Sequence, residues 1–395
     1  MRLAYLSKNL IAGVWRSEGG RDGDAWGIFG ALFDRRLRRI GDEFQINLRH
    51  TEGVQFYPTI ASTNDGFVVA WYDLGNDRDS PQLISAQRFD AAGHRLGEEI
   101  DLAVPPNDYG FYPEAASLNG ERKGDVVLVW DSFDGTGNGS GFDIAARFIG
   151  RAGAVSDRTI LNASTARDEG NPSVAATADG YIVTWTGYDA SGSDVFARRF
   201  LNSGAPLGDE FRVNTYTDRG QFASVIAVSP EGSFVVVWTS GDRHFPDLSQ
   251  DGDDNGLYAQ AYAANGTRIG EEIQVSTETK GRQGTVLNTT SISFVNNTDF
   301  VVVWDDAEPG RSIWVYGRRF RLSPDRRLCG DSVGADLTVR AADALGVLRA
   351  SVGLSACDLC SCDADGSGAM TSTDAQVVLR HSVGLGGAMV CPACG

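Results

Sequence analysis

The sequence predicts an all-β fold, a six-bladed β-propeller with four-stranded blades, followed by a small α-helical domain. A run of aliphatic residues that ends in tryptophan recurs six times within residues 1–322, and successive tryptophans lie 56, 59, 55, 53 and 66 residues apart. Such a period is typical of propeller blades. Glycine accounts for 48 of the 395 residues, which indicates many turns and short strands. All six cysteines lie at or beyond Cys329, so a second domain begins near that position.

The first five repeats each contain four candidate strands, the number found in a propeller blade. In the fourth repeat they cover residues 173–176, 181–185, 196–200 and 208–214. The first strand has small residues, as expected beside a crowded central axis, and the second is apolar almost throughout, as expected of a strand buried on both faces. We therefore expect the tryptophans that close the second strands to fill the space between blades: Trp15, Trp71, Trp130, Trp185, Trp238 and Trp304.

The two ends of the repeat region differ from its middle. The six units begin near residues 1, 58, 113, 172, 223 and 289, and the sixth has three strands that end at residue 320. A closed propeller commonly joins its termini within one blade, so either the sixth blade is short or the natural chain starts before Met1. Residues 1–15 match the start of a blade and show no signal-peptide cleavage site.

The repeats also share sequence patterns outside the tryptophan. Segments such as residues 66–71 (GFVVAW) and 208–214 (GDEFRVN) recur with small changes. In these patterns, residues 1–322 resemble the Trp-containing propeller repeats of secreted bacterial surface proteins. The resemblance implies an extracellular or cell-surface location and names no ligand. The Asp-Gly turns that precede the tryptophans differ from the Asp-containing turn of sialidase propellers, so we expect no sialidase chemistry.

The loops of the predicted propeller divide between two faces. Short turns at residues 63–66, 177–180 and 229–232 form a regular face. On the other face the loops are longer and acidic, and the links between blades carry aromatic residues: Phe56, Tyr57, Tyr109, Phe111, Tyr112 and Phe222. Because functional residues favour loops on a rigid scaffold, we expect the site on this second face. Candidate calcium ligands there are Asp22, Asp24, Asp251 and Asp253, with solvated Asp-Gly turns as the alternative interpretation.

Composition and motifs narrow the function. The formal net charge of −17 argues against nucleic acid and anionic membrane surfaces as partners, and no apolar run is long enough to span a membrane. The four histidines are scattered and form no Ser/His/Asp or Cys/His pattern. We expect a binding protein whose propeller holds a carbohydrate or a protein ligand. The alternatives are a carbohydrate-active hydrolase or lyase that uses paired carboxylates, and a structural surface protein.

A short linker at residues 323–328 leads to a C-terminal domain at residues 329–395. Six cysteines within this domain suggest disulfide bonds and an oxidising, extracellular compartment. The alternative is a zinc site, because Cys357 and Cys360, like Cys391 and Cys394, have the spacing of a zinc ribbon.

Residues 363–374 have the pattern of an EF-hand calcium loop. Oxygen-bearing side chains occupy loop positions 1, 3, 5, 9 and 12, a backbone carbonyl is expected at position 7, and Gly368 stands at the sharp turn. The predicted ligands are Asp363, Asp365, Ser367, Ala369, Thr371 and Asp374. Residues 374–383 then predict an amphipathic helix with Val377, Val378 and Leu379 on its apolar side.

A second copy of this unit precedes it, because residues 343–354 parallel residues 374–385 at a spacing of 31. Two such loop–helix units resemble the type I dockerin domain, and especially the cysteine-bearing dockerin-like modules of secreted bacterial proteins. The resemblance implies calcium binding, a cohesin-type protein partner and a link to polysaccharide degradation. Asp336 and Asp343 are the carboxylates that remain in the first loop, so we expect weaker calcium binding there. If the two units pack as a symmetric pair, Cys329 bonds to Cys391 or Cys394.

Overall fold

The computed structural model describes most of the repeat region and short parts of the C-terminal region. The described residues are 1–21, 23, 26–75, 83–103, 109–133, 141–164, 167–189, 192–241, 250, 252, 254–277, 282–283, 290–307, 314–322, 347–348, 351, 364, 369 and 371–382. Within them, no helix is long and apolar enough to cross a membrane.

Six antiparallel sheets follow one another along the chain, and we number them as blades one to six. Blades one to three are β1 (Arg2–Ser7), β2 (Leu10–Glu18), β3 (Trp26–Asp34) and β4 (Arg39–Gln45); β5 (Gln55–Ser62), β6 (Gly66–Asp73), β7 (Leu83–Asp90) and β8 (Ile100–Ala103); β9 (Tyr109–Ser117), β10 (Val126–Phe133), β11 (Asp143–Ile149) and β12 (Thr159–Ile160). Blades four to six are β13 (Asp168–Ala176), β14 (Gly180–Asp189), β15 (Gly192–Leu201) and β16 (Phe211–Arg212); β17 (Gln221–Val228), β18 (Phe234–Ser240), β19 (Gly256–Tyr262) and β20 (Arg268–Gln274); β21 (Arg282–Gln283), β22 (Ser291–Phe294), β23 (Asp299–Ala307) and β24 (Trp314–Arg321).

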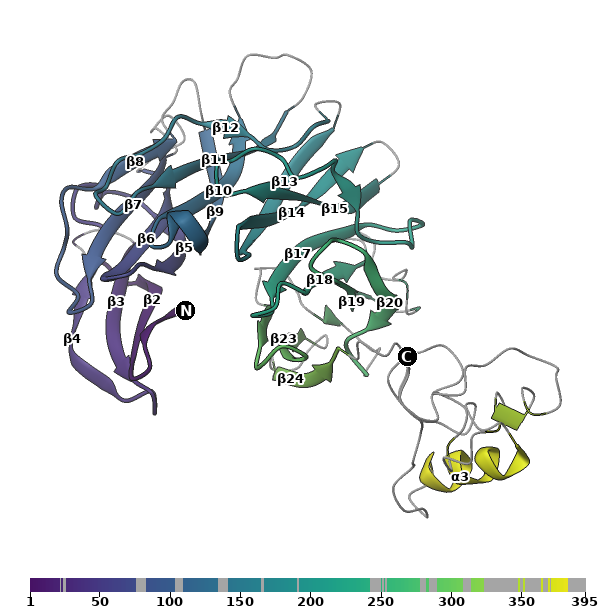
Figure 1. Cartoon of the computed structure of the whole chain (residues 1–395). Helices are drawn as coiled ribbons and strands as arrows, with labels where there is room; N and C mark the ends of the chain where they lie inside the picture. The colour runs from purple at the N-terminus through teal and green to yellow at the C-terminus, as the bar shows by residue number, and fades with distance from the viewer. Residues whose placement is uncertain are drawn as a thin grey trace.

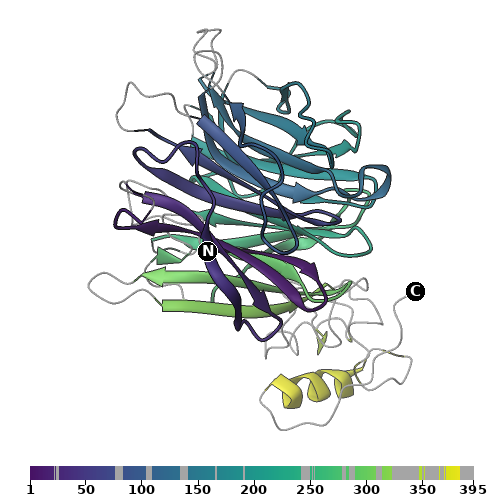
Figure 2. The same cartoon turned by 90° about the vertical axis from the view of Figure 1, so that its left-hand side faces the viewer.

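This arrangement confirms the predicted six-bladed propeller of four-stranded, antiparallel sheets. The blades follow one another around an arc, with blade one and blade six at its two ends (Figure 1). Turned by 90°, the sheets are seen layered against one another (Figure 2). The first strands of blades two to five begin a few residues earlier than predicted, because each continues through a β-bulge before the segment that the sequence pattern marks.

Blade six differs from the other blades. β21 and β22 both pair with β23, so they stand as two parts of one first strand, and β24 pairs with β23 on its other side. No fourth strand follows β24 within the described part of the chain. This matches the three-stranded sixth unit that the sequence predicts.

The tryptophans of the second strands form the core between blades. Trp71, Trp130, Trp185 and Trp238 are 0% exposed and Trp304 is 6% exposed, which confirms the prediction for five of the six. Five apolar clusters join the blades in chain order, from the pair of blades one and two to the pair of blades five and six. Among the described residues, no such cluster joins blade six to blade one, and the sixth tryptophan, Trp15 on blade one, is only half-buried.

The C-terminal helix whose bounds the structure describes is α3 (Ser372–Ser382), and the described residues 347, 348 and 351 are also helical. Helix α3 begins two residues before the predicted start, and its buried residues include Ala375 and Val378. Leu379 is 46% exposed, so its predicted place on the apolar side was wrong: it follows Val378 by 100° around the helix and faces away. These described helical residues do not establish a two-unit dockerin-like domain.

Candidate functional site

The structure describes only part of the predicted calcium sites. Ala369, Thr371 and Asp374 fall on described residues. All six cysteines lie outside the described residues, and so do the other predicted ligands. These ligands are Asp22, Asp24, Asp251, Asp253, Asp336, Asp343, Asp363, Asp365 and Ser367. No group of three or more His, Cys, Asp or Glu side chains that could hold a metal ion occurs in the part of the chain that is described.

Thr371 and Asp374 form a capping box at the start of α3. The Asp374 Oδ2 atom accepts hydrogen bonds from the Thr371 N–H at 2.7 Å and from the Thr371 hydroxyl at 3.0 Å. The Thr371 hydroxyl in turn accepts the N–H of Thr373 at 3.2 Å. This arrangement satisfies two N–H groups at the helix start, so Asp374 has a structural role whether or not it also binds calcium.

The most distinctive surface feature of the propeller is a continuous row of aromatic side chains on blades one to three, at the ends where first strands begin and second strands finish. We call it the aromatic belt. Its members are Trp26, Phe56, Tyr57, Tyr72, Tyr109, Phe111, Tyr112, Phe133 and Phe142. All except the buried Tyr72 are half-buried. The belt lies on the face where the sequence predicts the functional site.

Each ring of the belt contacts the next. The centroid of Trp26 lies 5.2 Å from that of Phe56, and the centroids of Tyr57 and Tyr112 are 4.7 Å apart. At the blade-one end, the guanidinium of the exposed Arg16 lies 3.8 Å from the Trp26 ring centroid. The belt is thus an amphipathic surface whose ring edges and hydroxyl groups can contact a ligand that has both apolar and polar faces.

A left-handed backbone conformation within a β-bulge positions the two central tyrosines of the belt. Tyr57 and Tyr112 have a φ of 49°, and Asn171 and Ala223 take the same left-handed conformation at the corresponding positions of blades four and five. Each sits in a bulge where the pairing of the first strand shifts. Bulges redirect side chains, and a non-glycine residue at positive φ costs about 1 kcal/mol or more.

The preceding blade holds these bulges in place in the second half of the propeller. The N–H of Asn171 donates to Asp131 Oδ1 at 2.9 Å, and the N–H of Ala223 donates to the Thr186 hydroxyl at 3.2 Å. Asp131 and Thr186 both directly follow an inter-blade tryptophan. Asp131 therefore has a structural role as a bulge acceptor.

The Glu114 carboxylate of β9 connects the first strands of blades one, two and three. It forms an ion pair with Arg2 of blade one, and its Oε2 atom accepts a hydrogen bond from the Thr59 hydroxyl of blade two at 3.4 Å. Burial raises the pKa of the Glu114 carboxyl above its ordinary value, while the nearby Arg2 guanidinium and the Thr59 hydroxyl act in the opposite direction. The Glu114 side chain retains 19% exposure.

Glu169 is a second carboxylate with a raised pKa. It occupies the first-strand position that is glutamine in three other blades (Gln55, Gln221 and Gln283), and its side chain is fully buried. Burial raises its pKa from 4.5 to about 7 although Arg167 donates to it at 3.1 Å. Without exposure it cannot contact a ligand, and we assign it a structural role.

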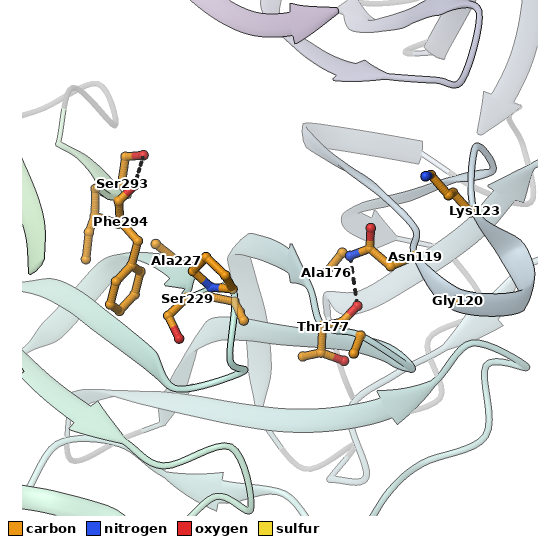
Figure 3. Close-up of a pocket in the computed structure, with 13 residues that line it drawn as sticks. Asn119, Gly120, Lys123, Ala176, Thr177, Ala227, Ser229, Ser293 and Phe294 are labelled. Carbon is orange, nitrogen blue, oxygen red and sulfur yellow. Dashed lines mark hydrogen bonds between the residues drawn. The ribbon is translucent and has the colours of Figure 1, made fainter. Parts of the chain in front are cut away.

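A cavity of about 700 Å³ lies at the opposite ends of the first strands, on the face with short turns. Figure 3 shows its lining residues, which come from blades three to six and include Asn119, Thr177, Ser229 and Phe294. The Asn119 side chain donates to the Thr177 carbonyl at 2.9 Å. Lys123 is the one charged residue of the lining. The sequence did not predict a cavity on this regular face.

Sequence analysis found part of the belt and missed the rest. It identified Phe56, Tyr57, Tyr109, Phe111 and Tyr112, which the structure brings together, whereas Phe222 is buried on blade five. Trp26, Tyr72, Phe133, Phe142, Arg16 and Glu114 were missed. The recurring dipeptides Tyr57-Pro58, Tyr112-Pro113 and Asn171-Pro172 could have located the bulges.

Comparisons with known proteins identify the fold alone. No protein-family model matches the sequence, and no curated protein matches it. The chain is similar to the crystal structure of a protein of unknown function from Dyadobacter fermentans DSM 18053, with 12% identity, a TM-score of 0.51, and 82% of this chain and 94% of that chain covered. It is also similar to the α-L-arabinanase of Penicillium chrysogenum complexed with arabinobiose, with 10% identity, a TM-score of 0.52, and 81% and 92% covered.

Proposed function

We propose that this is a carbohydrate-active protein whose aromatic belt holds an extended polysaccharide. The observation that carries this proposal is the series of contacting rings across three blades, in which every ring except the buried Tyr72 is half-buried. The C–H faces of sugar rings pack on aromatic rings, and the tyrosine hydroxyls can bond to sugar hydroxyls. A row of rings suits a repeating chain better than a single compact ligand.

Two activities fit such a belt, cleavage of the glycan or binding alone. The fold of the Penicillium arabinanase, which was solved with arabinobiose, favours cleavage, the function that sequence analysis gave as an alternative to binding. Glu114 is the carboxyl group to test as the general acid, because burial raises its pKa as a general acid requires, while its ion pair with Arg2 acts in the opposite direction. Glycoside hydrolysis generally uses a second carboxylate, for which the acidic loops of this face are the source to test.

The binding proposal is tested with a panel of polysaccharides that includes arabinan, by affinity electrophoresis. The double variant Tyr57→Ala/Tyr112→Ala should weaken binding about 10- to 100-fold, because two stacking rings contribute roughly 1–3 kcal/mol together. Tyr5→Ala is the matched control, since Tyr5 is 72% exposed and lies outside the belt. Equal binding by the double variant and the control would show that the belt is not the site.

The cleavage proposal needs a separate measurement. The same panel is assayed for new reducing ends and for the unsaturated products of a lyase. If Glu114 is the acid, Glu114→Gln should retain binding and lose product formation by 100-fold or more. A wild-type protein that binds a glycan and releases no product supports the binding function instead.

For residues 329–395 we propose a calcium-dependent, dockerin-like attachment module with a cohesin-type partner. Support comes from the loop pattern and from α3, whose start coincides with the end of the predicted loop. Calorimetric titration of the full chain should show one calcium site stronger than any other. Asp363→Ala should abolish it and Asp336→Ala should leave it. Two equal sites, or none, would contradict the proposal.

An extracellular location belongs to the same proposal. It predicts disulfide bonds among the six cysteines, with Cys329 joined to Cys391 or Cys394. Peptide mapping under non-reducing conditions tests the bond. A fully thiol-reactive protein that contains zinc would support the alternative metal site.

A further inference from the structure

Blade six exposes a strand edge that is covered in every other blade. The third strands share one register position, opposite the residue that follows the inter-blade tryptophan, and its occupants in blades one to five are 0% exposed: Ile28, Ile84, Ile144, Val195 and Leu257. In blade six this position is Val315, opposite Asp305, and it is 74% exposed. Its neighbours Trp314 and Tyr316 are 62% and 48% exposed.

In the other blades, the side chain at this position packs in the cluster shared with the following blade. A fourth strand covers its backbone through a hydrogen bond. The N–H of Val213 donates to the Val195 carbonyl at 2.8 Å, and the N–H of Val275 donates to the Leu257 carbonyl at 2.7 Å. The same bond recurs in blades one and three. The third-strand residue thus directs its carbonyl outward, away from the second strand.

An asparagine after the fourth strand accepts a hydrogen bond from the N–H of the same third-strand residue. The Oδ1 atom of Asn214 accepts the N–H of Val195 at 2.8 Å, and Asn47 and Asn162 make the same bond in blades one and three at 2.8 and 2.9 Å. Asn214 also donates to the Asp194 carboxylate at 2.6 Å. A hydrophobic residue followed by asparagine therefore satisfies both outward backbone groups of the third strand.

A glutamate earlier in the fourth strand binds the preceding blade. Glu210 of blade four accepts the N–H of Ala163 at 2.8 Å, and Glu272 of blade five accepts the N–H of Thr215 at 2.9 Å. The third strand also holds the glycine of the turn, since Arg198 donates to the Gly208 carbonyl at 3.2 Å. These contacts give a physical meaning to the repeated pattern Gly-x-Glu-(Phe/Ile)-x-(Val/Ile)-Asn.

Blade six and the end of blade five have residues that correspond to those that contact the fourth strand in blade four. Val315 corresponds to Val195, Arg318 corresponds to Arg198, and Thr277 of blade five corresponds to Thr215 as the N–H that a glutamate would bind. The other two arginines of β24, Arg319 and Arg321, form ion pairs with Asp299 of β23. Within the described residues no strand lies on this edge.

We propose that β24 binds an extended peptide of the pattern Gly-x-Glu-(Phe/Ile)-x-(Val/Ile)-Asn as an antiparallel fourth strand of blade six. Continuity with the other blades supports this occupant, because all five hold a fourth strand on this edge. Blades one and four carry the full pattern there, at residues 41–47 and 208–214. A second copy of this chain is a poorer occupant, since its segments of this pattern are already paired in its own blades. This inference does not depend on the proposed function.

The test uses a fluorescently labelled peptide of residues 207–214 (LGDEFRVN) and the full chain, with binding followed by fluorescence anisotropy. Val315→Pro should weaken binding at least tenfold, because it removes the outward N–H that asparagine accepts. That N–H does not pair with β23, so the variant should keep its melting temperature. Val315→Thr retains the N–H and should bind as the wild type does.

Three results would overturn the proposal. The first is no saturable binding to the wild type, and the second is equal affinity of the wild type and Val315→Pro. The third is a dimer of the wild-type protein that Val315→Pro dissociates in the absence of peptide, which would identify a second copy as the occupant. A peptide that ends in alanine in place of asparagine should bind more weakly. Hydrogen exchange at Val315, Gly317 and Arg319 should slow when the LGDEFRVN peptide is added.

Discussion

Blade four and blade six are built on the same kind of second strand, yet their third strands have opposite surroundings. Val195 in blade four is 0% exposed, and Val315 at the same register position in blade six is 74% exposed. The residue type is the same and the pairing with the second strand is the same. The difference teaches that a strand of this array is buried by its neighbours, so the sequence of the strand alone does not report its burial.

Blade one shows the same effect at the other end of the array. Trp185 is fully buried because blade three packs against it. Trp15, at the corresponding position of blade one, is half-buried, and within the described residues no preceding blade covers it. Within the described residues, each end blade therefore packs against one neighbouring blade, whereas each middle blade packs against two.

The largest effect expected from this comparison concerns the tryptophans. Trp185→Ala should lower the free energy of unfolding by about 3–5 kcal/mol, since it removes a fully buried side chain and leaves a cavity. Trp15→Ala should cost less than half as much, because part of that side chain already contacts water. Urea denaturation of both variants checks this. Equal losses would mean that the ends of the arc are packed as its middle is.

A smaller effect is expected from the asparagine that fixes a fourth strand. Asn214→Ala should destabilise the protein by about 2 kcal/mol, because the N–H of buried Val195 loses its acceptor. This substitution leaves the outward N–H of the third strand of blade four without its asparagine acceptor, which is also the state of the Val315 N–H within the described part of blade six. Asn214→Ser is the control, as Ser276 occupies this position in blade five. A loss within experimental error for Asn214→Ala would show that the asparagine bond is dispensable.

The pH dependence of stability distinguishes blade four from its neighbours. The folded pKa of Glu169 is about 7 and the ordinary value is 4.5, so the unfolded chain ionises first and stability falls as the pH rises from about 4.5 to about 7. Glu169→Gln removes this fall, and at pH 8 it should be more stable than the wild type by about 2 kcal/mol. At pH 4 the two proteins should be nearly equal.

The reverse substitution in blade five is the control for this pH effect. Gln221→Glu places a carboxyl at the corresponding buried position and should add a fall of stability with rising pH. Thermal melts between pH 4 and pH 8 measure both variants. A parallel pH profile for the wild type and Glu169→Gln would contradict the raised pKa.

The smallest effect is expected at the exposed edge. Val315→Thr should change the free energy of unfolding by less than about 0.5 kcal/mol, as is usual for exposed positions. Val195→Thr places a hydroxyl in the core between blades and should cost about 1–3 kcal/mol. Chemical denaturation measures the free energy of unfolding of both variants. Similar losses for Val315→Thr and Val195→Thr would indicate that β24 is covered in solution.

The sequence predicted what depends on local periodicity. The six blades, their four-strand order and the burial of Trp71, Trp130, Trp185, Trp238 and Trp304 follow from the aliphatic runs and from the spacing. Trp15 could not be distinguished from the others, because its partial exposure reflects the packing between blades: among the described residues, no blade packs against it as blade three packs against Trp185. Val195 and Val315 likewise share a register position, so the sequence pattern could not predict that one is buried and the other exposed.

The site was predicted only as a face of the propeller. Phe56 and Tyr112 stood out as aromatic residues in links between blades. Trp26 is the first residue of a third strand and Phe142 directly precedes one, and both join the belt only through the packing of neighbouring elements. Glu114 was missed because its partners Arg2 and Thr59 are distant in sequence. The calcium loop at residues 363–374 remains a prediction.

The linear succession of five interfaces between six blades has a consequence for unfolding. In the described part of the chain each inner blade is held from two sides, while blades one and six are each held from one. In such nearest-neighbour arrays, the free energy of opening a unit depends on how many neighbours it loses. Transient opening should therefore start at the two end blades, and amide exchange should slow progressively toward blades three and four.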